Sequence, residues 1–466
     1  MVDPIKTELA SRADIWLQVK PGHDGLLAMA MINEIISAGV YDSNFIREWT
    51  IGFEVLQAPA GAFPPEKIAD DIWLDPAVVR DAAHLYATAR PACIIDGNGL
   101  DMQLDVFQTT RTACILRALT GNIDKPGGDL VPEPVPIRNI QLRERLPAGV
   151  EPVTQAYPLF NKFHETWGLH VQSAVIDAIM DEKPYPVKML VVQSGNPAIT
   201  MTDSHRVKKA LQKLEFMVVI DPFMTRMAEF ADIVLPASTC FEKTQLNRAY
   251  MRDSLVMIQD QVIDWFADSW PDWKITFDLA RRLGLAEEFP WESVEEAINY
   301  QLEPAGITVE ALRENPDGLR VEKVRYEKHK IHGFNTLSGK VELYSERLKK
   351  NGFLPVPYQD GVYRNPTSFS GRDKEFPFIG ISGARTSRFT HTQFHRIPEL
   401  LASEPEGFAD IHPHDARARG IADGDMVRIS TPRGCIEMKA RISDLVHPGS
   451  LRIAWGWGGN LIRIRV

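Results

Sequence analysis

The chain has 466 residues, of which 44% are hydrophobic and 24% are charged, and its formal net charge is −10 at pH 7. This composition is typical of a globular protein with material for about three domains of ordinary size. The acidic balance disfavours nucleic acid as a partner, because such binding depends on Lys and Arg that release counterions from phosphates. No apolar run approaches the ~20 residues that a membrane span requires, so direct membrane insertion is not expected.

The first part of the chain predicts mainly helices. The segment "LLAMAMINEII" predicts a helix over 26–38, since its apolar residues recur on one face. Further helices are expected over 72–90 and 105–121, and a strand over 92–99, where "ACIIDGNG" runs into a glycine turn. Residues 130–160 are rich in proline and predict an irregular crossing between domains.

The middle of the chain predicts a parallel sheet. An apolar run over 187–192 is short enough for a buried strand, and the helical spacing of apolar residues over 204–214 follows it. A second strand is expected over 215–221, then a short helical turn over 225–231 and a third strand over 232–238. The order strand, helix, strand favours parallel pairing.

The last 91 residues have a different pattern. From Phe376 onward, "PFIGISG", "MVRIST", "CIEMKARIS" and "SLRIAWG" are short strands separated by turn residues. The segment "HPHDARARGI" interrupts them with one helical turn. This spacing predicts a small β-barrel.

The cysteines are few and widely separated: Cys93, Cys114, Cys240 and Cys435. No C-x-x-C pair occurs, so the chain itself is not expected to hold an iron–sulfur cluster or a structural zinc. Isolated cysteines are typically small buried hydrophobes, which is the expectation for these four.

One segment occurs twice. "VDPIKTELASRADIWL" begins at Val2, and "IDPFMTRMAEFADIVL" begins at Ile220, shifted by 218 positions with agreement at eight of them. The second copy follows its own strand and helix, whereas the first begins almost at residue 1. A parallel strand alone leaves backbone groups unpaired. The first copy is therefore expected to continue a sheet that lies upstream or in a partner.

Seven segments in this order resemble the large catalytic subunit of molybdopterin oxidoreductases of the dimethyl sulfoxide reductase and formate dehydrogenase type. They are the repeated D-P-x-x-T-x-x-A-x-x-A-D-I, "KPGHDG", "LTGNIDKPGGD", "SGNPA", "ADIVLPASTCFEK", "TLSGKVELYS" and "IHPHDARARGIADGDMVRISTPRG". The resemblance runs from residue 2 to about residue 458. It implies an α/β fold with Rossmann-like parallel-sheet domains, an internal pseudo-repeat and a C-terminal double-psi-type β-barrel.

The resemblance also implies the domain organisation. Residues 1–145 would form an N-terminally incomplete α/β domain with the first guanine dinucleotide pocket. Residues 146–375 would form a second α/β domain with the second pocket. Residues 376–466 would form the barrel that binds molybdopterin dinucleotide, ending earlier than is usual in the family.

The implied cofactor is two molybdopterin guanine dinucleotides with molybdenum or tungsten. The repeat then has a physical reason, because each dinucleotide needs a pocket at the carboxyl ends of parallel strands. The family's [4Fe–4S] cluster and its metal ligand would lie in a missing N-terminal region. No catalytic residue and no metal ligand is therefore assigned in this chain, which by itself is expected to retain little metal.

Sixteen positions match cofactor-binding positions of the family. In the first pocket, His23 stands where the family usually has a small hydroxyl residue before the aspartate. Lys243 matches a lysine that reaches the dinucleotide phosphates, a role that suits a point cation. The cofactor-binding candidates are Asp3, Gly22, Asp24, Asn98, Gly99, Gln103, Asn196, Asp221, Lys243, Asp272, Ser382, Gly383, Arg385, His391, Thr392 and Gln393.

Structural interpretations of some of these residues remain open. Asp3 and Asp221 precede proline, and Asp-Pro pairs initiate turns, so both are read either as turn formers or as contacts to the guanine base or ribose. Asp14 and Asp232 are read as turn or helix-end residues. His391 and His395 have metal-like spacing, but no third ligand accompanies them, so a zinc site is not expected.

The resemblance implies two-electron redox chemistry or oxygen-atom transfer on a small-molecule substrate, with activity of this chain alone uncertain. A non-catalytic structural subunit of the same fold is the alternative. An NAD enzyme with two Rossmann domains ranks last, because no G-x-G-x-x-G follows a strand. An iron–sulfur electron-transfer subunit and the missing N-terminal segment are the expected partners. The location would be cytoplasmic if Met1 is the true start, and periplasmic if an export signal lies upstream.

Overall fold

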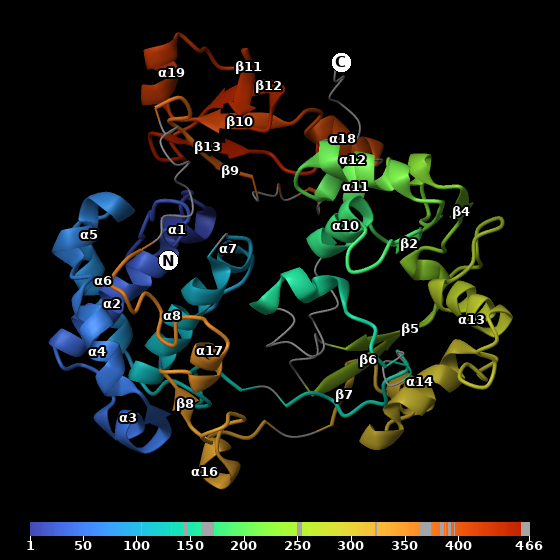
Figure 1. Cartoon of the computed structure of the whole chain (residues 1–466), viewed down its shortest axis with the longest axis horizontal. Coiled ribbons are helices and arrows are strands. Elements are labelled where there is room, and N and C mark those ends of the chain that lie inside the picture. The colour runs from blue at the N-terminus through green and yellow to red at the C-terminus, as the bar shows by residue number, and fades with distance from the viewer. Residues whose placement is uncertain are drawn as a thin grey trace. The chain divides into compact units, whose positions relative to one another are not determined.

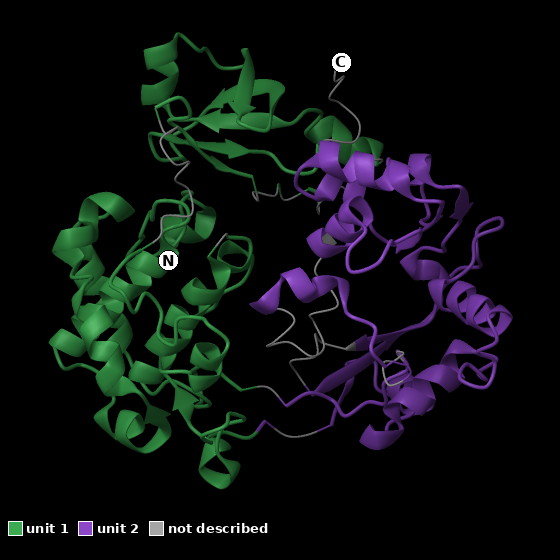
Figure 2. Cartoon of the chain, viewed as in Figure 1, with its two compact units in different colours: residues 1–131, 325–466 green, residues 132–324 purple. Residues whose placement is uncertain are grey.

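The computed structural model divides into two compact units (Figures 1 and 2). Unit 1 comprises residues 1–131 and 325–466, and unit 2 comprises residues 132–324. The residues that the structure describes are 1–103, 105–131, 133–142, 145, 148–159, 172–248, 254–321, 324–363, 374–382, 386, 388–389, 393–395 and 397–457.

The first part of unit 1 is helical. Its helices are α1 (Glu8–Arg12), α2 (Asp24–Ser37), α3 (Ser43–Trp49), α4 (Phe53–Gly61), α5 (Pro65–Ile72), α6 (Pro76–Thr88), α7 (Asn98–Asp101) and α8 (Val106–Leu119). Two later helices, α16 (His329–His332) and α17 (Glu346–Lys350), belong to the same unit. A short strand β1 (Thr50–Ile51) pairs in parallel with β8 (Val341–Glu342). The predicted helices over 26–38, 72–90 and 105–121 are confirmed as α2, α6 and α8.

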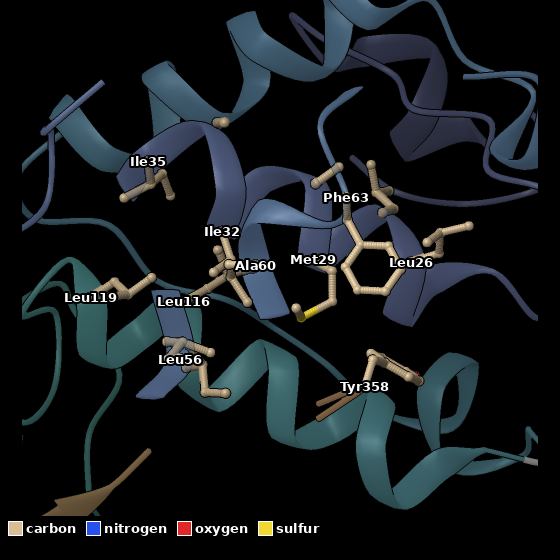
Figure 3. Packing of buried hydrophobic residues seen from close by; sticks show 14 of the residues in the cluster. Leu26, Met29, Ile32, Ile35, Leu56, Ala60, Phe63, Leu116, Leu119 and Tyr358 are labelled. Atoms are coloured by element: carbon tan, nitrogen blue, oxygen red, sulfur yellow. The ribbon is translucent and has the colours of Figure 1, made fainter. Parts of the chain in front are cut away.

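Helix α2 forms the centre of the largest core. Its apolar side chains, among them Met29 and Ile32, are fully buried and pack with residues of α4, α6 and α8. Figure 3 shows these side chains gathered around α2, with Tyr358 joining from a distant part of the sequence. Gly25 allows this approach, because a Cβ at that position would lie 2.3 Å from the Tyr358 hydroxyl oxygen. The core therefore fixes the start of α2, where Asp24 lies.

The carboxyl-terminal part of unit 1 is a five-stranded mixed sheet. Its strand order is β11 (Met426–Thr431), β12 (Gly434–Ile442), β10 (Phe408–Ile411), β13 (Ser450–Ile453) and β9 (Ile379–Ile381). Helices α18 (Pro398–Ser403) and α19 (Pro413–Arg419) accompany it. Four of these strands were predicted, but β10 was not. The expected α/β class with a carboxyl-terminal β domain is confirmed.

Unit 2 contains the predicted parallel sheet. Its strands are β2 (Met189–Gln193), β3 (Phe216–Ile220) and β4 (Ile233–Leu235), in that order and all parallel. An antiparallel sheet joins β5 (Gln245–Arg248), β6 (Leu255–Gln259) and β7 (Leu319–Arg320). The helices of this unit are α10 (Gln172–Asp181), α11 (Pro197–Thr200), α12 (Ser204–Lys213), α13 (Asp272–Arg282), α14 (Val294–Leu302) and α15 (Val309–Glu314), with 3-10 turns at Val153–Ala156, Ala228–Phe230, Cys240–Glu242 and Glu303–Ala305.

The strand predicted over 92–99 is wrong. Side chains, not a neighbouring strand, bond to the backbone of this segment. The Ala92 N–H donates to Asn122 Oδ1 at 3.2 Å, and the Ile94 N–H donates to the Asp129 carboxylate at 3.3 Å. Arg117 Nη2 donates to the Ile94 carbonyl at 3.0 Å. The N–H groups of Ala92 and Ile94 and the Ile94 carbonyl are thereby satisfied without a sheet.

Three further expectations differ from the structure. The first repeat copy also predicts a strand over 13–21, "ADIWLQVKP", and this strand is reduced to a parallel bridge between Leu17 and Val2. All four cysteines are exposed and not buried. Residues 325–363, expected within the second domain, associate with the first 131 residues, because β8 pairs with β1 and Tyr358 enters the α2 core. The three-part division itself stays a prediction.

None of the helices in the described ranges is long and apolar enough to cross a membrane.

Candidate functional site: two related pockets

The sequence repeat is also a repeat of hydrogen bonds. The Asp3 N–H donates to the Leu17 carbonyl at 3.2 Å, and the Asp221 N–H donates to the Leu235 carbonyl at the same distance. Each carboxylate Oδ1 accepts from the backbone N–H two residues later, at 2.8 Å in both copies. Both aspartates therefore form turns, as the structural interpretation expected. A nucleotide contact by either carboxylate stays a prediction.

In the first pocket, the predicted residues Asp24, Gly99 and Gln103 come together. Asp24 is the first residue of α2, where a carboxylate is favoured by the helix dipole. Gln103 Nε2 donates to Asp24 Oδ2 at 2.6 Å and contacts the Gly99 carbonyl at 2.5 Å. Gly22 lies at φ 80°, a left-handed conformation that favours glycine. The Tyr363 hydroxyl donates to the Gly22 carbonyl.

The two carboxyl groups of the first pocket are held in a poorly solvated environment. Burial raises the pKa of Asp24, although the Gln103 amide lowers it in part and nearby Asp3 raises it further. Burial likewise raises the pKa of Asp3, against the Ile5 N–H and the Arg452 guanidinium, which lower it. Hydrogen-bond donors from a ligand would stabilise both carboxylates and lower both pKa values, because such donors favour the charged form.

His23, which departs from the family's pattern, is a packing residue in this structure. Its side chain is 2% exposed, and its ring centroid lies 5.4 Å from that of Tyr363. Nδ1 lies 3.1 Å from the Pro21 carbonyl oxygen, so Nδ1 carries the proton. Burial lowers the pKa of His23 to about 4. The imidazole is therefore neutral at pH 7.

In the second pocket, the predicted residues follow the carboxyl ends of the parallel strands. Asn196 follows β2 and begins α11, and Asp221 follows β3 directly. After β4, residue Ala237 forms a parallel bridge with Trp270, two residues before Asp272 at the start of α13. This edge of the sheet is where ligands bind in open α/β folds.

Lys243 contacts a carboxylate of the same pocket. Its ammonium group forms an ion pair with Asp272 Oδ2, and both side chains are 17% exposed. Gln193 Nε2 donates to Asp272 Oδ1 at 3.0 Å. Burial raises the pKa of Asp272, but the hydrogen bonds from Lys243 and Gln193 outweigh it and hold the pKa below its usual value. Asp272 is thus ionised at neutral pH.

The sequence did not identify Gln193 or Ser238. Gln193 is the last residue of β2, and a glutamine at a strand end carries no signal by itself. Ser238 is 4% exposed, and its Oγ has no hydrogen-bond partner among the described residues. Its position in "LPAS", three residues beyond the end of β4, would have been the available signal, since Asn196 lies three residues beyond the end of β2.

The remaining candidates lie outside these contacts. Asn98 begins the four-residue α7, next to Gly99, and is exposed. Ser382 follows β9, and Gln393 is exposed. Four candidates lie outside the described residues: Gly383, Arg385, His391 and Thr392.

A surface cavity of about 570 Å³ in unit 1 contains none of the candidates. It is lined by Thr120 and Asn122, beyond the carboxyl end of α8, together with Arg90 and Tyr326. Asp24 and Gln103 are near the opposite end of that helix. A helix of 14 residues is about 20 Å long, so this length separates them from the cavity. We therefore place the candidate site on hydrogen-bonded residues and not on this cavity.

Comparison with known proteins identifies the family. A parallel sheet with polar side chains at its carboxyl edge is typical of α/β proteins that bind nucleotides. The chain matches the molybdopterin oxidoreductase family over residues 1–282 and the molybdopterin dinucleotide-binding domain over residues 379–464. The chain belongs to the molybdopterin oxidoreductase family, and the second match supports a molybdopterin cofactor.

Several named relatives align with almost the whole chain. Acetylene hydratase of Syntrophotalea acetylenica is 30% identical, covering 98% of this chain and 66% of that protein. The F420-dependent formate dehydrogenase subunit alpha of Methanocaldococcus jannaschii is 30% identical, covering 96% of this chain and 66% of that protein. The thiosulfate reductase molybdopterin-containing subunit of Salmonella typhimurium is 26% identical, covering 98% of this chain and 64% of that protein. The chain thus spans slightly less than two thirds of these relatives.

The structure agrees with these alignments. Acetylene hydratase from Pelobacter acetylenicus superposes with a TM-score of 0.90 at 28% identity, over 98% of this chain and 66% of that one. The chain therefore shares its fold with this relative over nearly its whole length.

Proposed function

We propose that this chain is the part of a molybdenum or tungsten oxidoreductase that binds two molybdopterin guanine dinucleotides. The whole protein would catalyse two-electron redox chemistry, including oxygen-atom transfer, on a small-molecule substrate. When bound, the cofactor supplies the redox-active metal and its sulfur ligands, and the protein supplies binding, orientation and electrostatics.

The observation that carries this proposal is the duplicated turn at Asp3 and Asp221. A fold with one nucleotide has no need of two such turns with matching hydrogen bonds to Leu17 and Leu235. Two related dinucleotides require two related pockets. The family match supports a molybdopterin dinucleotide as ligand, and a pair of guanine dinucleotides would fit this duplication.

The second pocket also has unmet hydrogen-bonding capacity. The Oδ1 atom of Asn196 and the Oγ atom of Ser238 are buried and have no hydrogen-bond partner among the described residues. A buried polar atom without a partner costs about 1–3 kcal/mol. Ribose hydroxyls and the guanine amino group are donors that would satisfy the Asn196 amide oxygen, so these residues fit the proposed ligand.

The residues of this chain would bind and orient the dinucleotides. Asp24 and Asp272 accept hydrogen bonds from guanine, and Gln103 and Lys243 hold these carboxylates in place. Lys243 is committed to Asp272 in this structure. Its predicted contact with the dinucleotide phosphates would require the ammonium group to serve both partners.

The named relatives bear on the expected partners and on the non-catalytic alternative. Two relatives are named as subunits, which supports a partner protein, and an iron–sulfur electron-transfer subunit suits redox chemistry. The named relatives are enzymes, so they give no support to a structural subunit without bound metal. The [4Fe–4S] cluster stays part of the proposal for the whole protein.

Analysis of bound cofactor tests the proposal. The chain would be produced in cells that make molybdopterin, purified without oxygen, and assayed for oxidised pterin by fluorescence. The expected result is pterin that copurifies with the chain and is diminished by Asp272→Asn. Absence of pterin from the purified chain, or retention unaffected by Asp24→Asn and Asp272→Asn together, contradicts the proposal.

A hydration reaction is a second candidate. The similarity to acetylene hydratase, at a TM-score of 0.90, favours it, and such a reaction adds water across a triple bond without net electron transfer. The whole protein with acetylene would then form acetaldehyde without an electron acceptor. Reduction of a dye by formate, with no acetaldehyde from acetylene, favours the redox reaction instead.

A further inference from the structure

The Asp272 carboxylate is held by two side chains from different elements. Gln193, at the end of β2, donates from Nε2 to Oδ1 at 3.0 Å. Lys243, which follows the 3-10 turn Cys240–Glu242, contacts Oδ2. Each oxygen therefore has one protein donor, and since a carboxylate offers about four lone-pair sites, each oxygen can accept another hydrogen bond.

The orientation of the Gln193 amide follows from the charge of its partner. Asp272 is ionised and can only accept, so the amide nitrogen must face it. This leaves Gln193 Oε1 without a hydrogen-bond partner among the described residues. The contact is thus a defined, one-directional hydrogen bond.

The backbone at Asp272 is fixed by packing, whereas its carboxylate is not. Ile275 of α13 packs with Val218 and Ile220 of β3 and with Ala237, which anchors the first turn of the helix on the sheet. The terminal torsion of aspartate is broad, because it joins an sp³ and an sp² atom. Contacts with Gln193 and Lys243 are therefore what orient the carboxylate plane.

We infer that Gln193 is a positioning residue of the second guanine pocket, which orients the Asp272 carboxylate so that both oxygens accept from one guanine base. The inference rests on the proposed function. Guanine presents two adjacent donors, the ring N1–H and the 2-amino group, to a carboxylate. Hypoxanthine lacks the amino group, and adenine has an acceptor at N1. A fixed carboxylate plane therefore selects guanine over both.

The role of Gln193 differs from that of Lys243. The ammonium group neutralises the carboxylate as a point charge and constrains its direction weakly. The amide of Gln193 is planar and donates along a defined direction. Loss of Gln193 should thus relax base selection more than it weakens overall binding, whereas loss of the charge at Lys243 should weaken binding of every nucleotide.

The test uses calorimetric titration of the full 466-residue chain with GMP and with IMP. All proteins carry Asp24→Asn, so that the titration measures nucleotide binding at the second pocket alone. Gln193→Leu removes the donor at similar volume, and Gln193→Glu places a like charge beside Asp272. Gln212→Leu is the matched control, since Gln212 is exposed on α12 of the same unit.

We expect Gln193→Leu to weaken GMP binding roughly 5- to 10-fold, the size of one ordinary hydrogen bond, because Gln193 acts on the base only through Asp272. IMP binding should fall less, so the preference for GMP over IMP shrinks. Gln193→Glu should weaken GMP further, and Gln212→Leu should change neither nucleotide. A merely structural role for Gln193 would lower both affinities equally or shift only the melting temperature.

Two outcomes overturn the inference, and they are distinguishable. In the first outcome, GMP binds, Asp272→Asn abolishes that binding, and Gln193→Leu changes both the affinity for GMP and the GMP-to-IMP ratio by less than twofold. Gln193 then does not position the carboxylate. If GMP does not bind even with Gln193 and Asp272 intact, the proposed second pocket itself is wrong, and the inference falls with it.

Discussion

Asp3 and Asp221 are equivalent residues, each bonded through its N–H to a leucine carbonyl 14 residues later at 3.2 Å. Each also closes a turn through Oδ1, which accepts a backbone N–H at 2.8 Å. The sequence repeat is therefore a structural repeat, maintained in two different units of the chain. The same carboxylate can form the turn and contact a nucleotide, and substitutions can separate these two roles.

Asn at position 3 or 221 should keep the turn and lose the charge. An asparagine side chain still presents an oxygen to the backbone N–H two residues later. Asp3→Asn and Asp221→Asn should therefore leave the melting temperature within a degree or so, while weakening guanine nucleotide binding. Asp→Ala at the same positions should lower both stability and binding, measured by thermal unfolding and titration. Equal nucleotide affinity in the Asn variants and the wild type would leave these aspartates with a turn-forming role alone.

Removal of Gln103 should destabilise unit 1 through Asp24. Gln103 Nε2 donates to the buried carboxylate at 2.6 Å, and Gln103→Leu would leave that oxygen without its donor. Hydrogen bonds to charged groups contribute about 1.5–3 kcal/mol, and we expect a loss of this order in the free energy of unfolding at pH 7. Gln57→Leu on the exposed face of α4 is the control. A loss below the error of the denaturant titration would mean that water replaces the Gln103 amide.

His23 should make the protein less stable in mild acid. Its pKa is about 4 in the fold, because burial outweighs the Pro21 carbonyl, while Lys20 lowers it further and Asp71 raises it. In the unfolded chain the pKa is about 6.5. Between pH 6.5 and 4 the unfolded state binds a proton that the folded state does not, so stability falls as the pH falls. The loss reaches on the order of 3 kcal/mol below pH 4.

His23→Gln should remove this part of the pH dependence. The measurement is the free energy of unfolding at several values between pH 7 and pH 4, compared between the wild type and the variant. His332→Gln, which alters an exposed histidine of α16, should keep the wild-type slope. Parallel curves for the wild type and His23→Gln would show that His23 takes up a proton in the folded state near its ordinary pKa.

At the buried ion pair between Asp124 and Lys328, replacing one partner should lower the free energy of unfolding more than replacing both. Lys328 Nζ lies 2.5 Å from Asp124 Oδ1, and the two side chains are 7% and 1% exposed. Lys328→Met leaves a buried carboxylate without its counter-ion, which typically costs about 3–5 kcal/mol. The double variant Asp124→Asn/Lys328→Met should recover a large part of this loss, since no buried charge remains. Denaturant unfolding measures both, with Arg12→Ala in the exposed Glu8–Arg12 pair as a control of small effect.

Regular patterns predicted the fold where local sequence and packing agree. Helices α2 and α8 and strand β3 have apolar spacing that matches their burial, whereas β2 and β4 were predicted from apolar runs that stay partly exposed, with Met189 at 50% and Ile233 at 44%. The failures have local causes. Asn122, Asp129 and Arg117 bond to the backbone over 92–99, so an apolar segment is not a strand.

Strand β10 was missed because a buried charge lies within it. Asp410 is fully buried, and Arg441 and Arg452 from neighbouring strands pair with it at 2.5 and 3.2 Å. A charged residue in a four-residue segment argues against a buried strand unless its partners are known. Those partners are 31 and 42 positions away, beyond the reach of a local pattern.

The sequence named some residues of the candidate site, but not the contacts between them. The resemblance assigned Asp24 and Gln103 separately, and the structure brings them together across 79 positions. Lys243 contacts Asp272 in this structure, a contact that the sequence did not indicate, and its contact with the dinucleotide phosphates stays a prediction. Gln193 had no signal, because its role arises only when the end of β2 meets the start of α13.

The number of guanine nucleotides bound by the 466-residue chain tests the central claim most directly. Calorimetric titration with GMP should give two sites per chain, and Asp24→Asn or Asp272→Asn should each reduce this to one. Retention of the fold would be checked by thermal unfolding of each variant. A wild-type stoichiometry of one or zero, or two sites that persist in both variants, would contradict the assignment of two related guanine pockets.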